Sequence, residues 1–189
     1  AAAPAQDGKG LGRFRYADIN GDGKITTDDR TFLGSPVPTF TGGINVGLTY
    51  RNFEFATYLY ASAGNKIWNQ SKWFTDFFGT FEGSGKGERA KQSWTPELGN
   101  SAAAPIWESA SNMSTSAGAN SWYVENGDYI RVQNISLGYN IPKSYTSKLG
   151  IKRAKFTLSA NNLLTITKYK GLDPGVGGAV DTGFGIDVG

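Results

Sequence analysis

The sequence has 189 residues, 39% of them hydrophobic, and its 26 Gly, nine Tyr, eleven Phe and five Trp favour turns and aromatic strands over an all-helical fold. Because it contains neither Cys nor His, disulfides, thiolate or imidazole zinc sites and Ser-His or Cys-His triads are excluded. The formal net charge of +3 comes from 19 basic and 16 acidic residues spread along the chain, so charge gives no indication of nucleic acid binding.

The start of the chain carries no recognisable targeting signal. No stretch reaches the ~18 apolar residues of a membrane-spanning helix, and the basic and apolar regions of a signal peptide are missing. A transmembrane β-strand needs only about 9–11 residues of alternating character, and the sequence allows one. We interpret residues 1–13, which are rich in small residues, as a low-complexity leader or linker.

Residues 14–40 contain a calcium-type loop. The twelve residues DINGDGKITTDD follow the spacing of an EF-hand loop, with Gly at the sharp turn and an acid at the last position. The predicted oxygen ligands of Ca²⁺ are Asp18, Asn20, Asp22, Lys24 through its carbonyl, Thr26 and Asp29. The alternative is a metal-free turn, because Asn, Asp and Gly also dominate turns. Only one such loop occurs, so we expect a single site rather than an EF-hand pair.

Residues 41–63 have the pattern of a β-hairpin. Apolar side chains from Ile44 to Tyr50 alternate with Gly and polar residues, and a second alternating run begins at Phe53. Arg51 and Asn52 between the runs predict a two-residue turn. One face of the first run is therefore expected to be apolar and the other small and polar.

Residues 64–128 are predicted to form a long loop, far beyond the ~12–15 residues at which loops without structure become uncommon. Trp68, Trp73 and Phe74 belong to an aromatic cluster in this loop and are candidate ligand-binding residues. The alternative is packing: Trp73 and Phe74 have helical spacing with Phe77 and Phe78, which would form the loop's own small core or cover the edge of a barrel.

Two further runs in residues 129–166 alternate with a period of two: Ile135, Leu137 and Tyr139, then Phe156, Leu158 and Ala160. Ile130 and Val132 have the opposite parity from Ile135, which predicts a β-bulge or a change of environment near Gln133. Residues 167–189 are rich in Gly and are predicted to be a loop that stops before another strand.

The connections between the predicted strands alternate between short and very long. This asymmetry is typical of outer-membrane barrels, in which short periplasmic turns alternate with long extracellular loops. In soluble sandwiches the connections at both ends are usually of moderate length. Four strands cannot close a barrel, because even the smallest bacterial barrels need about eight. We therefore expect further strands from the same chain or from other chains.

No enzyme is predicted. Asp76 and Glu82 are two carboxylates of the kind that glycosidases use, but nothing in the sequence fixes their separation, and a chance pairing among 16 acids explains them. A phosphate-binding glycine loop with its Lys and Ser or Thr is also missing.

Several ordered motifs make the sequence similar to a known family. The segment FRYADINGDGKITTDDRTFLGSPVPTFTGGINVGLTYRNFEF resembles the C-terminal barrel region of SusC/RagA-type TonB-dependent outer-membrane transporters. The resemblance continues through WTPE (94–97), ENGDYIRVQNISLGYNIP (125–142) and FTLSANNLLTITKYKGLDP (156–174), so it covers nearly everything from about Phe14 onward.

The resemblance implies an all-β fold: antiparallel strands of a large transmembrane β-barrel of about 22 strands, with long extracellular loops. It further implies an N-terminal plug, a SusD-like surface lipoprotein as partner, energy from the TonB complex, contact with outer-membrane lipid, and location in the outer membrane of a Gram-negative bacterium. The sequence contains no plug and no TonB-contacting segment, so we interpret it as a fragment. Gly175 stands where family members commonly carry Glu after the Asp-Pro pair.

Two functions follow as hypotheses. The first is TonB-dependent import of glycans or oligopeptides, to which this chain would contribute barrel strands and extracellular loops. The second is a soluble, calcium-stabilised carbohydrate-binding β-sandwich. In a barrel the apolar faces of the strands contact lipid, whereas in a sandwich they face a second sheet. A dockerin-like adhesion module is a third option, but it needs a duplicated calcium loop.

Overall fold

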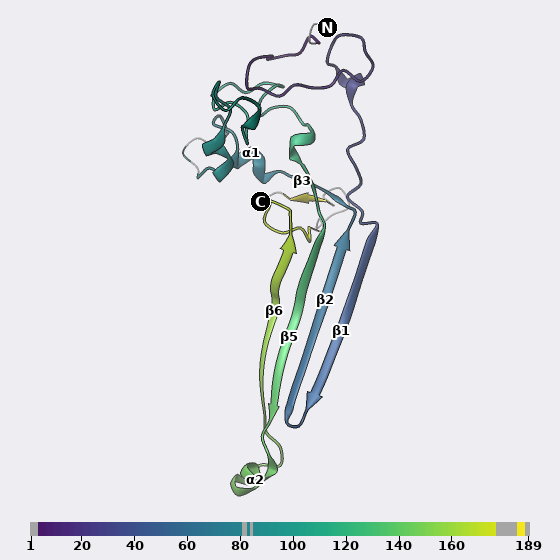
Figure 1. Cartoon of the computed structure of the whole chain (residues 1–189), viewed down its shortest axis with the longest axis vertical. Coiled ribbons are helices and arrows are strands. Elements are labelled where there is room, and N and C mark those ends of the chain that lie inside the picture. The colour runs from purple at the N-terminus through teal and green to yellow at the C-terminus, as the bar shows by residue number, and fades with distance from the viewer. Residues whose placement is uncertain (1–3, 81–82, 84, 177–184, 188–189) are drawn as a thin grey trace. The chain divides into compact units, whose positions relative to one another are not determined.

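The structure is a computed structural model that describes residues 4–80, 83, 85–176 and 185–187 (Figure 1). The chain divides into two compact units. The sheet unit comprises Ser35–Lys66 and Asn126–Tyr169, and the loop unit comprises Ala1–Gly34, Ile67–Glu125 and Lys170–Gly189. None of the helices in the described residues has the length and apolar character that a bilayer crossing requires.

Four long strands form the sheet unit: β1 (Phe40–Tyr50), β2 (Phe53–Ala63), β5 (Tyr129–Asn140) and β6 (Lys155–Thr167). They pair in the order β1-β2-β5-β6, and every pairing is antiparallel. Tyr50 pairs with Phe53, which confirms the predicted two-residue turn at Arg51 and Asn52. The β1–β2 and β5–β6 connections lie at the same end of the sheet (Figure 1).

The β5–β6 connection is partly helical, which the sequence pattern did not indicate. It contains the short helix α2 (Lys143–Thr146) and the 3-10 turn η5 (Ser147–Leu149). Pro142 precedes α2, a position where its missing N–H costs nothing. The turn ends at Gly150, whose φ of 70° is left-handed and therefore suits glycine.

The strand register gathers the apolar side chains on one face of the sheet. Because residues that pair directly share a face, Leu48 lies with Phe55, Leu137 and Leu158 across all four strands. The opposite face carries Gly, Ala, Ser, Thr, Asn and charged side chains, together with Tyr58, Tyr60 and Tyr129. The predicted division of the first strand into two faces is confirmed, and the apolar face extends over all four strands.

A β-bulge in β5 resolves the change of parity along this strand. Tyr58 pairs with Asn134 while its neighbour Leu59 pairs with Val132, so Gln133 is the extra residue. The register with β6 shifts at the same place. The predicted bulge near Gln133 is confirmed, and it brings Val132 back to the apolar face.

Short elements interrupt the long predicted loop in the loop unit. They are β3 (Lys66–Asn69), α1 (Ser71–Thr75), the 3-10 turns η2 (Glu88–Gln92), η3 (Gly99–Ser101) and η4 (Ser121–Tyr123), and β4 (Val124–Asn126). With β7 (Ile186–Asp187) they include a small sheet of order β4-β3-β7, in which β3 and β7 run parallel. The predicted helical spacing is only partly realised, because α1 ends before Phe77 and Phe78.

The described part of the N-terminal leader is hydrogen-bonded to the rest of the loop unit. Ala5 bonds the backbone of the calcium-type loop through its amide to Gly23 and through its carbonyl to Ile25, each at 2.9 Å. Arg13 forms a bidentate pair with Glu108 at 2.6 and 2.8 Å. Residues 5–13 therefore have defined positions within the loop unit rather than the lack of contacts expected of a linker.

Deleting Gln133 should prevent the sheet from forming, because removal of the bulge moves one half of the apolar residues of β5 to the polar face. Replacing Gln133 by Ala keeps the residue count and should leave folding intact. Circular dichroism of the β-sheet during urea unfolding measures both variants. Equal unfolding midpoints for the deletion and the substitution would contradict the assigned role of the bulge.

Candidate functional site

The apolar face of the four-stranded sheet has no cover in the part of the chain that the structure describes. Ile44 and Leu48 in β1 are 63% and 62% exposed, and Phe156 and Leu158 in β6 are 66% and 65% exposed. Soluble monomers rarely expose a continuous apolar surface of this kind. Large exposed apolar patches mark sites of contact with a membrane or with another protein. The face is therefore the main candidate functional surface.

An aromatic row crosses this face next to the two short connections. Tyr50 pairs with Phe53, Phe53 with Tyr139, and Tyr139 with Phe156, so each strand contributes one ring at the same level. The rings of Phe53 and Tyr139 have centroids 4.8 Å apart. Such rows are typical of the interface between lipid and water, where amphipathic rings sit at headgroup level. Sequence reasoning missed the row, because it becomes visible only when the register of all four strands is known.

The polar face is held by side-chain hydrogen bonds between strands. Glu54 in β2 accepts from Asn140 at 2.6 Å and pairs with Lys155 of β6 at 2.5 Å. Lys155 reaches Glu54 across Gly138, where a Cβ would lie only 2.5 Å from the lysine chain. Asn134 donates to Asn161 at 2.8 Å. These bonds satisfy polar groups within the sheet.

One hydroxyl on the apolar face is also satisfied internally. Thr57 shares the face of Phe55 and Leu59, and its Oγ1 donates to the carbonyl of Asn134 at 2.9 Å. Asn134 adjoins the bulge at Gln133. The bulge therefore leaves a backbone acceptor for a hydroxyl that would otherwise be unpaired in an apolar environment.

The strands have the dimensions of membrane strands, and the sheet has two open edges. The four strands contain 11, 11, 12 and 13 residues, and a tilted transmembrane strand needs about 9–11. Among the described residues, β1 and β6 each have a partner on one side only. Their outer backbone N–H and C=O groups are available to pair with further strands.

The calcium-type loop is organised by its own acidic side chains. Asp18 accepts from the amides of Gly21 at 2.7 Å and Gly23 at 2.8 Å. Asp29 accepts from the amides of Thr26 at 2.7 Å and Ile19 at 2.8 Å. These backbone bonds lower the pKa of Asp29, and the bond from Thr26 has the largest effect. The turn η1 (Thr27–Asp29) follows, capped by the Thr26 hydroxyl.

The donor atoms of the loop suit Ca²⁺ chemically, but in this structure they do not converge on one point. Its donors are the hard oxygens that Ca²⁺ prefers, and Gly23 adopts the positive φ of 82° that the sharp turn requires. Across the described residues, however, no group of three or more acidic, His or Cys side chains converges in a way that would hold a metal ion. The carboxylates instead bind backbone amides.

The candidate ligand-binding aromatics lie in the packed part of the loop unit. Trp68 stacks on Tyr123 with ring centroids 4.8 Å apart, and Trp73 meets Phe74 edge-on at 4.9 Å. Phe77 is 4% exposed and belongs to the core of this unit. Trp68, Trp73 and Phe74 are partly exposed, so a role in ligand stacking stays a prediction.

Of the imagined glycosidase pair, Asp76 is 2% exposed and pairs with Arg89 at 3.0 Å, whereas Glu82 lies outside the described residues. Asp76 also accepts from the Thr75 hydroxyl at 2.9 Å. Its contacts are those of a structural carboxylate that is buried and paired with a partly exposed Arg.

A second buried ion pair, which the sequence did not reveal, links α1 to β4. Lys72 pairs with Glu125 at 2.6 Å, and their side chains are 8% and 14% exposed. Lys72 also donates to the carbonyl of Trp122 at 2.5 Å. Burial by itself would raise the pKa of Glu125, but bonds from Lys72, the Lys170 amide and Asn69 outweigh it and hold this pKa below its ordinary value.

Replacing Glu125 by Gln should destabilise the loop unit by about 3 kcal/mol, because Lys72 would remain buried without its counter-charge. Since the folded pKa of Glu125 is lowered, the stabilisation is present at neutral pH and is lost as the pH falls below about 4.5. Limited proteolysis of residues 67–125 at pH 7 and pH 4 measures both effects.

The matched control is Glu88→Gln. Glu88 pairs with Lys91 at 2.8 Å, but the two side chains are 86% and 72% exposed, so the loss should be below about 1 kcal/mol. Equal protease sensitivity of the two variants would contradict a structural role for the buried pair.

The sequence is similar to those of several TonB-dependent receptors. It is 35% identical over 162 residues to TonB-dependent receptor P3 of Formosa agariphila, covering 84% of this chain and 15% of that protein. It is 27% identical over 172 residues to TonB-dependent receptor SusC of Bacteroides thetaiotaomicron, covering 88% of this chain and 16% of SusC. No protein-family model matches the sequence.

Solved structures of a related transporter have a similar fold. The structure of the RagAB peptide transporter superimposes with a TM-score of 0.66 and 25% identity, over 87% of this chain and 17% of the matched chain. The chain thus spans about one sixth of the length of the proteins it matches. Over more than four fifths of its length, the chain is homologous to a segment of the SusC/RagA-type TonB-dependent receptors.

Proposed function

We propose that this chain supplies four wall strands and extracellular loops to a TonB-dependent importer in the outer membrane of a Gram-negative bacterium. The observation that carries the proposal is the uncovered apolar face of the sheet, opposite a polar face whose groups bond one another. A barrel wall needs this arrangement, with lipid on one side and a polar lumen on the other.

The open edges of the sheet support the same proposal. Unpaired backbone groups in hydrocarbon cost several kcal/mol each, so a membrane sheet must close on itself. Four strands cannot close, and further strands beside β1 and β6 would complete a large barrel of about 22 strands. On this proposal, β1, β2, β5 and β6 form part of a larger ring.

We further propose a SusD-like surface lipoprotein and the TonB complex as partners, and glycans or oligopeptides as cargo. The homology to SusC and the similarity to the RagAB peptide transporter support this assembly. On this proposal the loop unit lies on the outer side and includes Trp68, Trp73 and Phe74 as aromatic platforms for cargo. The relatives are named as receptors and a transporter, which agrees with the expectation that the chain is no enzyme.

The alternative, a soluble calcium-stabilised carbohydrate-binding sandwich, requires a second sheet over the apolar face. Leu48 and Leu158 would be core residues in such a sandwich, and more than half of each side chain is exposed. The exposed fractions therefore favour the barrel wall.

Replacing Leu158 by Arg tests the membrane face directly. In a barrel wall, an Arg on the lipid face costs about 2–4 kcal/mol at the bilayer midplane and about 0–1 kcal/mol near the interface. Leu158 lies two residues from Phe156 of the aromatic row, so the Arg should cost about 1–2 kcal/mol and reduce insertion into outer-membrane vesicles. In a water-soluble protein, the same change would cover an apolar patch with charge and improve solubility. The two functions thus predict opposite outcomes.

The control is Ser159→Arg, one residue further along β6 and on the polar face. It adds the same charge and should leave insertion nearly unchanged. Insertion is measured as the protein that remains in the membrane fraction after carbonate extraction. Higher solubility of the Leu158 variant, with unaltered folding, would overturn the barrel proposal.

We also propose that the loop at residues 18–29 binds one Ca²⁺ ion through Asp18, Asn20, Asp22, the Lys24 carbonyl, Thr26 and Asp29. The three carboxylates, the amide, the hydroxyl and the carbonyl form a donor set suited to a hard cation. Binding would require the carboxylates to exchange amide contacts for the ion, with the ion serving to fix an extracellular loop.

Calcium should protect the segment before Thr41 from protease, and a chelator should remove the protection. Asp18→Asn keeps an oxygen acceptor for the loop amides but removes a charge, so it should abolish the calcium effect while the loop still forms. Asp28→Ala is the control, because Asp28 occupies a non-ligand position. Cleavage rates that do not respond to calcium in the unmodified protein would overturn the metal proposal.

A further inference from the structure

The β5–β6 connection has a composition that a solvated turn does not require. Residues 141–154 contain Lys143, Lys148, Lys152 and Arg153 and no acidic residue. In the described residues, none of these four side chains forms an ion pair. The nearest acid in the strand register, Glu54, is already bonded to Lys155 and Asn140. The connection therefore carries a net positive charge that the sheet does not neutralise.

The same connection exposes large apolar side chains. Tyr145 is 67% exposed, Leu149 is 76% exposed and Ile151 is 44% exposed. Tyr145 and Leu149 lie four residues apart across α2 and η5, which places them on the same side of the helical segment. Cationic and apolar side chains together on a short helical segment are typical of elements that lie in a membrane interface.

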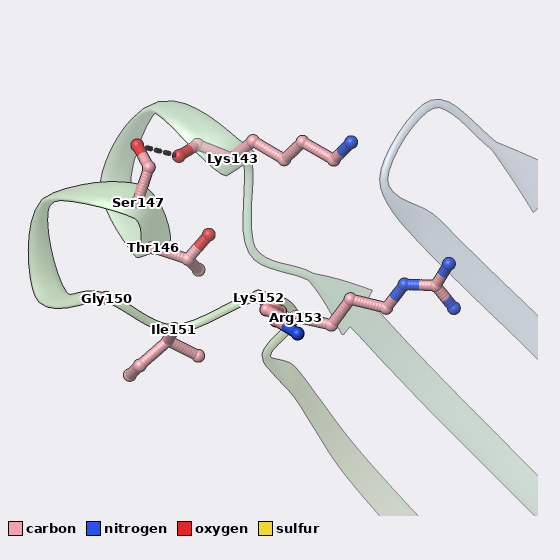
Figure 2. Close-up of a pocket in the computed structure, with 7 residues that line it drawn as sticks. All are labelled: Lys143, Thr146, Ser147, Gly150, Ile151, Lys152 and Arg153. Atoms are coloured by element: carbon pink, nitrogen blue, oxygen red, sulfur yellow. Dashed lines mark hydrogen bonds between the residues drawn. The ribbon is translucent and has the colours of Figure 1, made fainter.

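Three of the four basic side chains line a shallow depression in this connection. Lys143, Thr146, Ser147, Gly150, Ile151, Lys152 and Arg153 line it. Figure 2 shows that Lys143 and Arg153, from opposite ends of the connection, extend toward the same side. The Ser147 hydroxyl is occupied, because it donates to the Lys143 carbonyl at 2.7 Å. The cations are thus the groups available to an anionic partner.

The position of the connection matches the depth of lipid headgroups. The aromatic row of Tyr50, Phe53, Tyr139 and Phe156 lies at this end of the sheet, and the connection starts two residues after Tyr139. If the rings sit at the boundary between hydrocarbon and water, the next residues lie among the headgroups. Lysine and arginine chains can place their charges on phosphates there while their methylene groups stay in the apolar layer.

We infer that the α2–η5 connection is an interfacial anchor that binds the phosphate groups of anionic phospholipids. Tyr145, Leu149 and Ile151 enter the edge of the hydrocarbon, and the four cations bind headgroups around them. Charge complementarity selects an anionic lipid, because each Lys or Arg near a negatively charged surface gains about 1 kcal/mol. This inference rests on the proposed membrane function, since the sheet must first place the connection at the bilayer.

These 189 residues contain no Cys, so one introduced cysteine can carry a single fluorophore once any cysteine outside this segment has been replaced. Leu149→Cys reports on the connection and Leu48→Cys reports on the apolar face of β1. The whole protein that contains this segment is placed in nanodiscs of phosphatidylcholine alone or with one third phosphatidylglycerol. We expect the Leu149 label to shift to shorter wavelength, and to be quenched by headgroup nitroxides, only when phosphatidylglycerol is present.

Charge variants test whether the cations cause this response. Lys148→Gln with Lys152→Gln should lower the apparent affinity for phosphatidylglycerol about fivefold for each charge removed. The control removes two exposed cations of the loop unit, Arg30→Gln with Lys91→Gln, and should change nothing. A response of the Leu149 label that is equal in both lipids, or that survives in the Lys148/Lys152 variant, would overturn the anchor.

The Leu48 label separates failure of the anchor from failure of the membrane proposal. An apolar environment at Leu48 together with a water-exposed Leu149 label in both lipids overturns the anchor alone. Water exposure at both positions overturns the barrel wall and the anchor with it. A Leu149 label that is shielded in both lipids but not quenched by headgroup nitroxides means that protein covers the connection, which also overturns lipid binding.

Discussion

The structure depends on one constraint: within the described residues, the four-stranded sheet leaves its apolar face uncovered and both of its edges unpaired. In water, such a sheet would associate through its face and through its edges. In hydrocarbon, the face is solvated by lipid, and the edges must be paired because the bilayer core offers no hydrogen-bonding partner. On the proposed barrel function, lipid would cover Leu48 and Leu158, and further strands would pair with the outer edges of β1 and β6.

The bulge at Gln133 shows how the sheet keeps its two faces distinct. Without it, Val132 and Ile135 would point to opposite faces, and β5 would bring apolar residues to the polar side. The same irregularity gives the Thr57 hydroxyl its backbone acceptor. On the other face, Glu54 is bonded to Asn140 and Lys155, so its charge is compensated within the sheet. On both faces, polar groups are therefore satisfied by hydrogen bonds or ion pairs within the sheet.

The loop unit is stabilised by a different physical principle. Its core is small, and polar groups take part in it: Lys72 and Glu125 form a largely buried pair, and Trp68 stacks on Tyr123. Burial raises the pKa of Tyr123, so the phenol stays neutral in this core. Buried ion pairs add little net stability but lose much when one partner is removed, and they therefore favour one arrangement of a long loop.

The sequence alone determined the two faces of the first strand and the turn at Arg51 and Asn52, because side-chain alternation with a period of two is local and directly visible. It also located an irregularity near Gln133, which the strand register shows to be a bulge. It also identified the acidic loop through its spacing. Only the tertiary structure decided what depends on residues far apart in the chain. The row of Tyr50, Phe53, Tyr139 and Phe156 needs the register of four strands, and the Lys72–Glu125 pair joins residues 53 positions apart. Local pattern fixes which way a side chain points, whereas its partner depends on how distant strands and loops pair.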